Sequence, residues 1–170
     1  MTLASNEALL VIHVIMSLIG IASGVIVVYG LLSARPFGRW TALFLATTIL
    51  TSITGFPLPP FGFDPPRILG VISLVLLALA VVALYVFHLA GAWRGVYIAC
   101  ATAALYFNVF VGVVQAFQKL SFLRVLAPTQ SEPTFVIAQL AVLVLFIGLG
   151  VLAARRFHPG VKAGTLRSPA

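Results

Sequence analysis

Charged residues are scarce in this chain of 170 residues, where they make up 8% of the total. A soluble domain carries about 25%. The ten Lys and Arg residues give a formal net charge of +7, but they lie scattered between apolar runs and form no basic face. We therefore expect no nucleic-acid partner, and basic loops that face anionic lipid are the simpler explanation. Hydrophobic residues make up 62% of the chain, which predicts an integral membrane protein.

Cysteine and acidic residues are almost absent. The single Cys100 excludes an intrachain disulfide and a cysteine cage for a metal ion, and its apolar surroundings are typical of a small buried hydrophobic residue. The stretch from Met1 to Ala8 contains Glu7 and no Lys or Arg, so it lacks the basic region of a cleavable signal peptide. None of the three acids falls inside an apolar run, which disfavours a small permease coupled to protons.

Five apolar stretches reach or approach the roughly 20 residues that are needed to cross a bilayer. They are Ala8–Leu32, Trp40–Phe56, Leu69–Ala90, Val96–Phe117 and Phe135–Ala154. The sequence thus predicts an all-α integral membrane helical bundle of five spans, with residues 1–158 as one domain and 159–170 as a short basic tail. The second stretch is the shortest and is rich in threonine, so the alternative is four spans plus a re-entrant or tilted element.

The placement of Lys and Arg predicts the orientation. With five spans, one side receives Arg35, Arg39, Arg94, Arg155, Arg156, Lys162 and Arg167, and the other receives only Arg67, Lys119 and Arg124. The richer side is predicted to be cytoplasmic, which places the N-terminus outside and the C-terminus inside. An aromatic belt is expected at the cytoplasmic interface, formed by Tyr29, Trp40, Tyr85, Trp93 and Tyr97.

Proline marks the outer face. The loop 57–66 is proline-rich and is expected to be stiff. In the second outer loop, Lys119 to Leu126 is predicted to form a short interfacial helix that Pro128 ends. Glu132 and Pro133 are predicted to begin the last span. We therefore expect an ordered outer surface.

Polar side chains inside the predicted spans are costly and call for an explanation. When the spans alternate in direction, several of these side chains fall at one level, in the outer half or near the middle. The candidate ligand-binding residues are His13, Ser17, Thr51, Asn108, Gln115 and Gln139. One interpretation is helix packing, with hydrogen bonds between helices and close approach at Gly20-x-x-x-Gly24. The other is a small polar pocket for an amphiphile, such as a quinone or a lipid.

Haem is a specific alternative that the histidines allow us to examine. His13 lies just below the predicted outer surface and His88 just above the inner one, so they differ in depth by roughly 20 Å at 1.5 Å per residue. The two imidazoles therefore cannot ligate one haem, and a haem held by His13 alone stays the weaker alternative. We predict no cofactor, no metal site and no catalytic residue, with quinone or lipid as possible ligands.

Three segments carry a resemblance to known sequences: ALYFNVFV (residues 104–111), QAFQK (115–119) and APTQSEP (127–133). They resemble an uncharacterised family of small bacterial polytopic membrane proteins with no assigned activity. The resemblance covers mainly the fourth span and the second outer loop, about a fifth of the chain. It implies a bacterial inner-membrane location and transfers no functional residue.

Together these features predict a non-enzymatic integral membrane protein, either an accessory subunit or a binder of a small amphiphile or lipid. Its expected partners are membrane lipids and a protein partner or second copy within the membrane. The main alternative is a redox-associated protein that binds quinone near His13, Gln115 and Gln139. A small permease is a further alternative.

Overall fold

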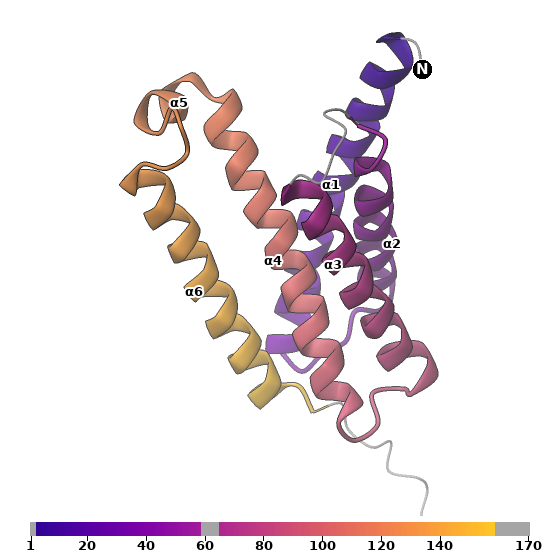
Figure 1. The fold of residues 1–170 in the computed structure, drawn as a ribbon. Coiled ribbons are helices and arrows are strands. Elements are labelled where there is room, and N and C mark those ends of the chain that lie inside the picture. Colours follow the sequence, from indigo (N-terminus) through magenta and orange to yellow (C-terminus); the bar gives the residue numbers. More distant parts are fainter. Residues whose placement is uncertain (1–2, 59–64, 159–170) are drawn as a thin grey trace, which may run out of the picture.

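The computed structural model describes residues 3–58 and 65–158, and every regular element in these two ranges is helical. The elements are α1 (Leu3–Leu32), α2 (Gly38–Gly55), α3 (Pro65–Val81), the π-helical turn η1 (Val82–Val86), α4 (Trp93–Lys119), α5 (Ser121–Leu126) and α6 (Pro133–Arg156). The long helices lie side by side in one elongated bundle (Figure 1). The predicted all-α helical bundle is confirmed.

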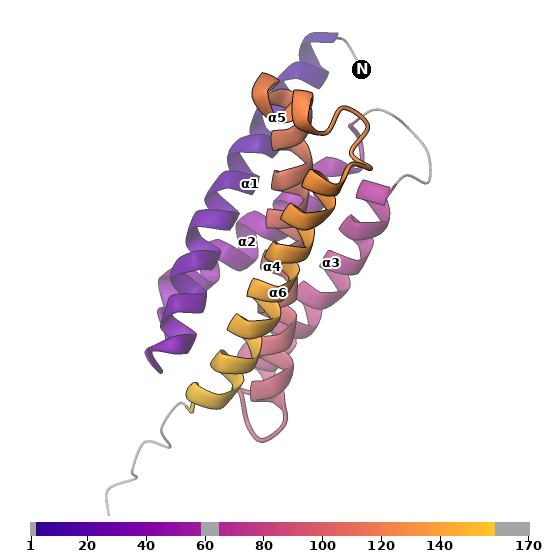
Figure 2. The same ribbon diagram turned by 90° about the vertical axis from the view of Figure 1, so that its left-hand side faces the viewer.

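Successive long helices alternate in direction, which gives the bundle two distinct ends (Figures 1 and 2). The start of α1, the start of α3 and helix α5 lie at what we call the upper end, as drawn in Figure 1. The links from α1 to α2 and from η1 to α4, and the end of α6, lie at the lower end. Segments far apart in sequence therefore share each end.

Four helical segments in the described part of the chain are long and apolar enough to cross a membrane. They are Asn6–Leu32, Pro65–Val86, Trp93–Lys119 and Pro133–Arg156, and they correspond to four of the five predicted spans. The remaining one, α2, has 18 residues and is less apolar, because it carries Arg39 and a series of threonines. By length and composition, four candidate spans are therefore supported directly. Helix α2 decides between five spans and four spans plus a re-entrant or tilted element.

The third segment ends earlier than predicted. Helical structure stops at Val86, whereas the apolar run had suggested Ala90. His88 and Leu89 adopt left-handed backbone angles, with φ of 48° and 61°, which a right-handed helix cannot accommodate. The ring of Phe87 stacks on that of Trp93, with centroids 4.0 Å apart, and so closes the turn into α4. Run length alone does not reveal such a local contact.

The elements of the second loop agree closely with the sequence. The short helix α5 ends at Leu126, before Pro128, and α6 has Pro133 at its first turn. Proline is favoured there because its fixed φ suits the helix and its missing N–H is not needed. The residues of the proline-rich loop from 59 to 64, and the predicted tail from 159 to 170, lie outside the described residues.

The apolar core is centred on α4 and includes buried residues of α1, α2, α3, η1 and α6. Helices α1, α2 and α4 approach one another closely at Gly24. A Cβ atom on Gly24 would lie only 2.5 Å from Cδ1 of Leu105 and 2.9 Å from Cδ2 of Phe44, so glycine permits this close approach. Helix α6 is the least embedded of the four candidate spans, since only 6% of its most apolar stretch is buried within the molecule. It lies along α4 at one side of the bundle (Figure 1).

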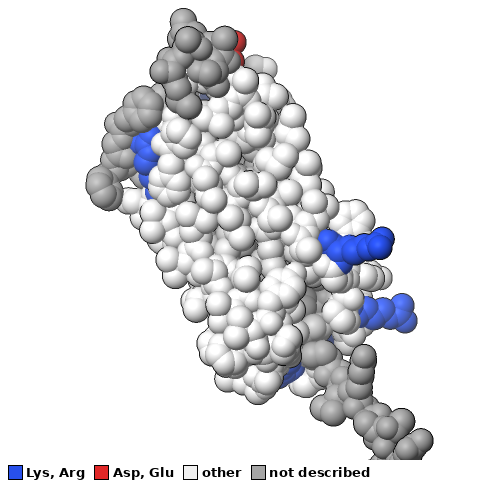
Figure 3. All heavy atoms as spheres, turned by 90° about the vertical axis from the view of Figure 1, so that its right-hand side faces the viewer, with Lys and Arg blue, Asp and Glu red and all other residues white. Residues whose placement is uncertain are grey.

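The outer circumference is apolar, whereas the charges are placed toward the ends. Figure 3 shows one broad face without charge, with Lys and Arg side chains only at its edges. Tyr29, Trp40 and Tyr85 of the expected belt are exposed at the lower end. Tyr97 is only 2% exposed, so its predicted place in the belt is wrong. The side chain of Tyr97 belongs to the buried core.

Candidate functional site

His13 lies between the upper parts of α1 and α2. Its Nδ1 is 3.1 Å from Oγ1 of Thr54, and its ring rests against Gly55, where a Cβ would lie 3.3 Å from Cε1 of the imidazole. The Thr54 hydroxyl donates to the carbonyl of Leu50 at 2.7 Å. With that hydroxyl proton directed to the Leu50 carbonyl, the neutral His13 tautomer that carries its hydrogen on Nδ1 donates to Thr54, and in this tautomer Nε2 is an acceptor.

A second group of polar atoms joins α1, α2 and α4 deeper in the bundle. The Ser17 hydroxyl donates to Oδ1 of Asn108 at 3.3 Å. A Cβ on Gly20 would lie 3.1 Å from Nδ2 of Asn108 and 3.1 Å from Oγ1 of Thr48. Both of these atoms are buried and have no hydrogen-bond partner in the described part of the protein, and the same holds for Oγ1 of Thr51. Buried donors of this kind are costly, so the group is incompletely satisfied.

The two glutamines lie elsewhere. Gln139 donates from Nε2 to the carbonyl of Phe110 at 3.2 Å, between α6 and α4, and its Oε1 is buried without a partner among the described residues. Gln115 is exposed. Helices α1 and α4 diverge toward the upper end (Figure 1), so Gln115 does not meet His13 there. The six candidate residues are thus distributed over several places, and none of them lines either of the two hollows described below.

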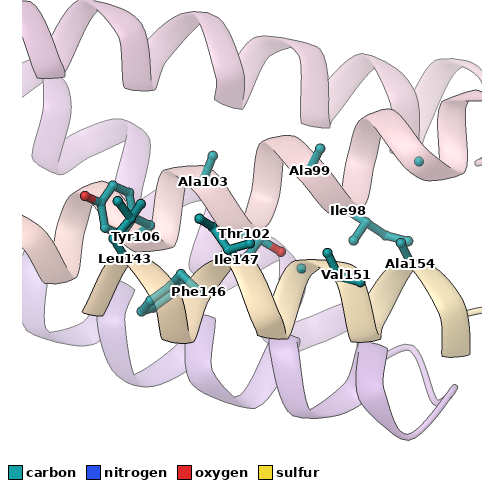
Figure 4. A pocket seen from close by; sticks show the side chains of 12 residues that line it. Ile98, Ala99, Thr102, Ala103, Tyr106, Leu143, Phe146, Ile147, Val151 and Ala154 are labelled. Carbon is teal, nitrogen blue, oxygen red and sulfur yellow. The ribbon is translucent and has the colours of Figure 1, made fainter. Parts of the chain in front are cut away.

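An apolar groove lies between α4 and α6, and sequence reasoning missed it. This α4–α6 groove has a volume of about 350 Å³. Small residues form much of its wall, namely Gly95, Ala99, Ala103, Gly150 and Ala154 (Figure 4). A helical spacing of Gly and Ala on two adjacent segments was the available signal, but it is also typical of ordinary close packing.

The groove is bounded along the helix axes. At its upper limit the rings of Tyr106 and Phe146 lie with centroids 5.8 Å apart and bring α4 and α6 together. At its lower limit the Arg94 guanidinium donates to the carbonyl of Phe157, again joining the two helices. Within the wall, the hydroxyl of Thr102 is buried and has no partner among the described residues. The result is a slot that is open to the side and ends near mid-bundle.

A second apolar hollow, of about 380 Å³, lies between the start of α3 and the middle of α4. Its walls include Pro65, Ile68 and Phe110. No polar side chain apart from Tyr106 lines it among the described residues. It therefore offers apolar surface without a polar anchor.

The loop between α5 and α6 is organised by Glu132. Its carboxylate accepts hydrogen bonds from the N–H and Oγ1 of Thr129, at 3.0 and 2.9 Å, and from the N–H of Ser131 at 3.1 Å. Desolvation opposes the shift, but these hydrogen bonds to the charged form prevail and lower the pKa of Glu132. At the same end, Arg67 donates to the carbonyls of Phe56 and Leu58, which ties the end of α2 to α3.

Geometry is the available guide to function, because comparison with family models, curated proteins and solved structures finds no match to this chain. Two places can act on another molecule. The polar group around Asn108 offers hydrogen-bond donors and acceptors inside the bundle. The α4–α6 groove offers an apolar slot with a guanidinium at its lower mouth.

Proposed function

We propose that the chain is a bacterial inner-membrane protein that crosses the bilayer five times, with the N-terminus outside. Helix α2 would be the fifth span: 18 residues rise about 27 Å, against a hydrocarbon core of about 30 Å, and local thinning accommodates so small a deficit. Two of its threonines suit such a setting. Thr47 and Thr54 donate to carbonyls of their own helix, at 2.7 Å each, and so carry no unpaired hydroxyl proton into lipid.

The distribution of charge supports this orientation. The described bases at the lower end are Arg35, Arg39, Arg94, Arg155 and Arg156, whereas the upper end has Arg67, Lys119 and Arg124. Basic residues accumulate on the cytoplasmic side of membrane proteins. The lower end would therefore face the cytoplasm.

Within this setting we propose that the protein is a non-enzymatic binder of an amphiphile, and that the α4–α6 groove is where the apolar part of the ligand lies. The observation that carries this proposal is the groove itself. Its volume of about 350 Å³ falls within the usual range of ligand sites, about 300–1,000 Å³. It opens to the side of the bundle, where lipids have direct access.

Two glycines on α6 provide a matched test. A Cβ on Gly150 would meet Cγ2 of Thr102 at 3.6 Å, inside the groove, whereas a Cβ on Gly148 would meet nothing within 4 Å. Native mass spectrometry of protein purified in mild detergent should show a bound amphiphile. G150L should lose that ligand because leucine fills the slot, while G148L should keep it. If G150L and G148L retain the ligand equally, the groove is not the site.

A quinone site near His13 is the second candidate. It is favoured by the unpaired Nδ2 of Asn108, which is a donor for a quinone carbonyl, and by the acceptor Nε2 of His13, which suits the O–H group of the reduced quinol. Extraction and absorption spectroscopy of the purified protein would detect a quinone. H13A should then abolish its retention, and a variant that keeps the quinone would count against this site. A protein partner that co-purifies in place of any small ligand would favour an accessory-subunit role.

A further inference from the structure

We propose that the α4–α6 groove takes one acyl chain of an anionic phospholipid from the leaflet at the lower end, with the phosphate bound by Arg94 and Arg155. This inference rests on the proposed amphiphile-binding function and specifies its ligand. It follows from the length of the groove, the charge at its mouth and the way in which it closes.

The length of the groove matches one leaflet. Its lining on α4 runs from Gly95 to Tyr106, a rise of about 16 Å at 1.5 Å per residue. Half of a hydrocarbon core is about 15 Å. A chain that enters at the lower end would therefore reach the closure formed by Tyr106 and Phe146 close to the bilayer midplane, where acyl chains end.

The mouth of the groove is cationic. Arg94 precedes the lining residue Ile98 by one helical turn, and its bond to the Phe157 carbonyl holds the guanidinium between α4 and α6. Arg155 follows the lining residue Val151 by one turn and is exposed. A guanidinium has five N–H donors, so Arg94 keeps donors for a phosphate after this bond.

Within residues 3–58 and 65–158, no acid at the lower end competes for these two side chains. The acids in the described part of the chain, Glu7 and Glu132, both belong to the upper end. The cationic mouth is therefore complementary to an anionic headgroup.

The shape of the groove favours an acyl chain over a helix. A helix of about 10 Å diameter would seat only a ridge of side chains in a groove of about 350 Å³, whereas an acyl chain can lie within it over the full length of about 16 Å. A spanning helix would also have to continue past the rings of Tyr106 and Phe146, where α4 and α6 come together. A single hydrocarbon chain meets neither obstacle.

The test uses the full chain in detergent, titrated with phosphatidylglycerol or with phosphatidylcholine of identical acyl chains, and reads bound lipid by native mass spectrometry. The wild-type protein should bind phosphatidylglycerol about tenfold more tightly, which corresponds to about 1.4 kcal/mol. R155Q should remove most of this preference. R39Q, which neutralises an exposed base on α2 at the same end, should keep it, and both exposed positions leave the core intact.

The outcomes separate this inference from the proposed function. If both lipids bind equally and G150L blocks the binding of both, the preference for an anionic headgroup is refuted, whereas the binding of an amphiphile in the groove is supported. If R39Q loses as much of the preference for phosphatidylglycerol as R155Q does, the general positive charge of the lower end explains the effect. Binding of the phosphate at the mouth of the groove is then refuted. If neither lipid binds, or if G150L instead dissociates a dimer, both the inference and the groove function fail.

Discussion

Replacing Gly24 by alanine tests how closely α1 packs against α2 and α4. The added Cβ would lie 2.5 Å from Cδ1 of Leu105 and 2.9 Å from Cδ2 of Phe44, and both neighbours are 1% exposed. Carbon atoms in good contact are about 3.5–4.0 Å apart. Because neither buried side chain has free space to move into, we expect an overpacking cost of about 1–3 kcal/mol.

Alanine also favours a helix over glycine by about 1 kcal/mol, and a second variant separates this effect. G148A makes the same exchange on α6, where nothing lies within 4 Å of the new methyl group. The free energy of unfolding of G24A should therefore fall below that of G148A by the full overpacking cost, about 1–3 kcal/mol. Relative to the wild-type protein, the loss in G24A should be smaller, because the higher helix propensity of alanine offsets part of the overpacking cost.

Unfolding by SDS in mixed micelles, followed by circular dichroism, measures both variants under one condition. The double variant G24A/L105V should lose less than the sum of the single losses, because valine lacks the Cδ1 atom that the new methyl group meets. Equal stability of G24A and G148A, or strict additivity in the double variant, would refute the packing of α1, α2 and α4 around this glycine.

The remaining predictions concern topology, pH and the groove wall. In a C100A background, S121C should react with an impermeant thiol reagent in intact cells, and S33C only after permeabilisation; the reverse pattern would overturn the orientation. Because the pKa of Glu132 is lowered, its contribution to loop order is full above the ordinary value of 4.5 and is lost as the pH falls through the folded-state pKa. Hydrogen exchange of the amides of Thr129 and Ser131, corrected for intrinsic rates, should therefore lose protection only as the pH falls through that pKa. In E132Q these amides should lack the protection at every pH. T102V should not destabilise the protein, because it removes a buried hydroxyl that has no partner among the described residues; a loss above about 1 kcal/mol in SDS unfolding would show a bond at that position.

The positions of the helices along the chain were largely predictable. The apolar runs are matched by helices, α5 ends before Pro128, and α6 begins at Pro133. These features depend on local properties, namely the length of an apolar run and the backbone restriction of proline. The end of the third segment was missed because it depends on the stacking of Phe87 on Trp93, a contact across a turn.

The grouping of polar residues was predictable only in part. Alternating span directions place Ser17 and Asn108 at one level, and the structure joins them by a hydrogen bond. The same reasoning placed Gln115 near His13, but α1 and α4 diverge toward the upper end and Gln115 is exposed. Level along the membrane normal follows from residue number, whereas separation across the bundle follows from how neighbouring helices tilt.

The sequence by itself determined the class of the protein, the extent of its helices and the unequal charge of its two ends. These properties add up residue by residue along the chain. Only the tertiary structure decided that α4 lies along α6, with the ring of Tyr106 near that of Phe146 and Arg94 bonded to the Phe157 carbonyl, and that a groove opens on the side of this pair. The groove depends on which faces of the two helices are brought together, which neither helix encodes alone.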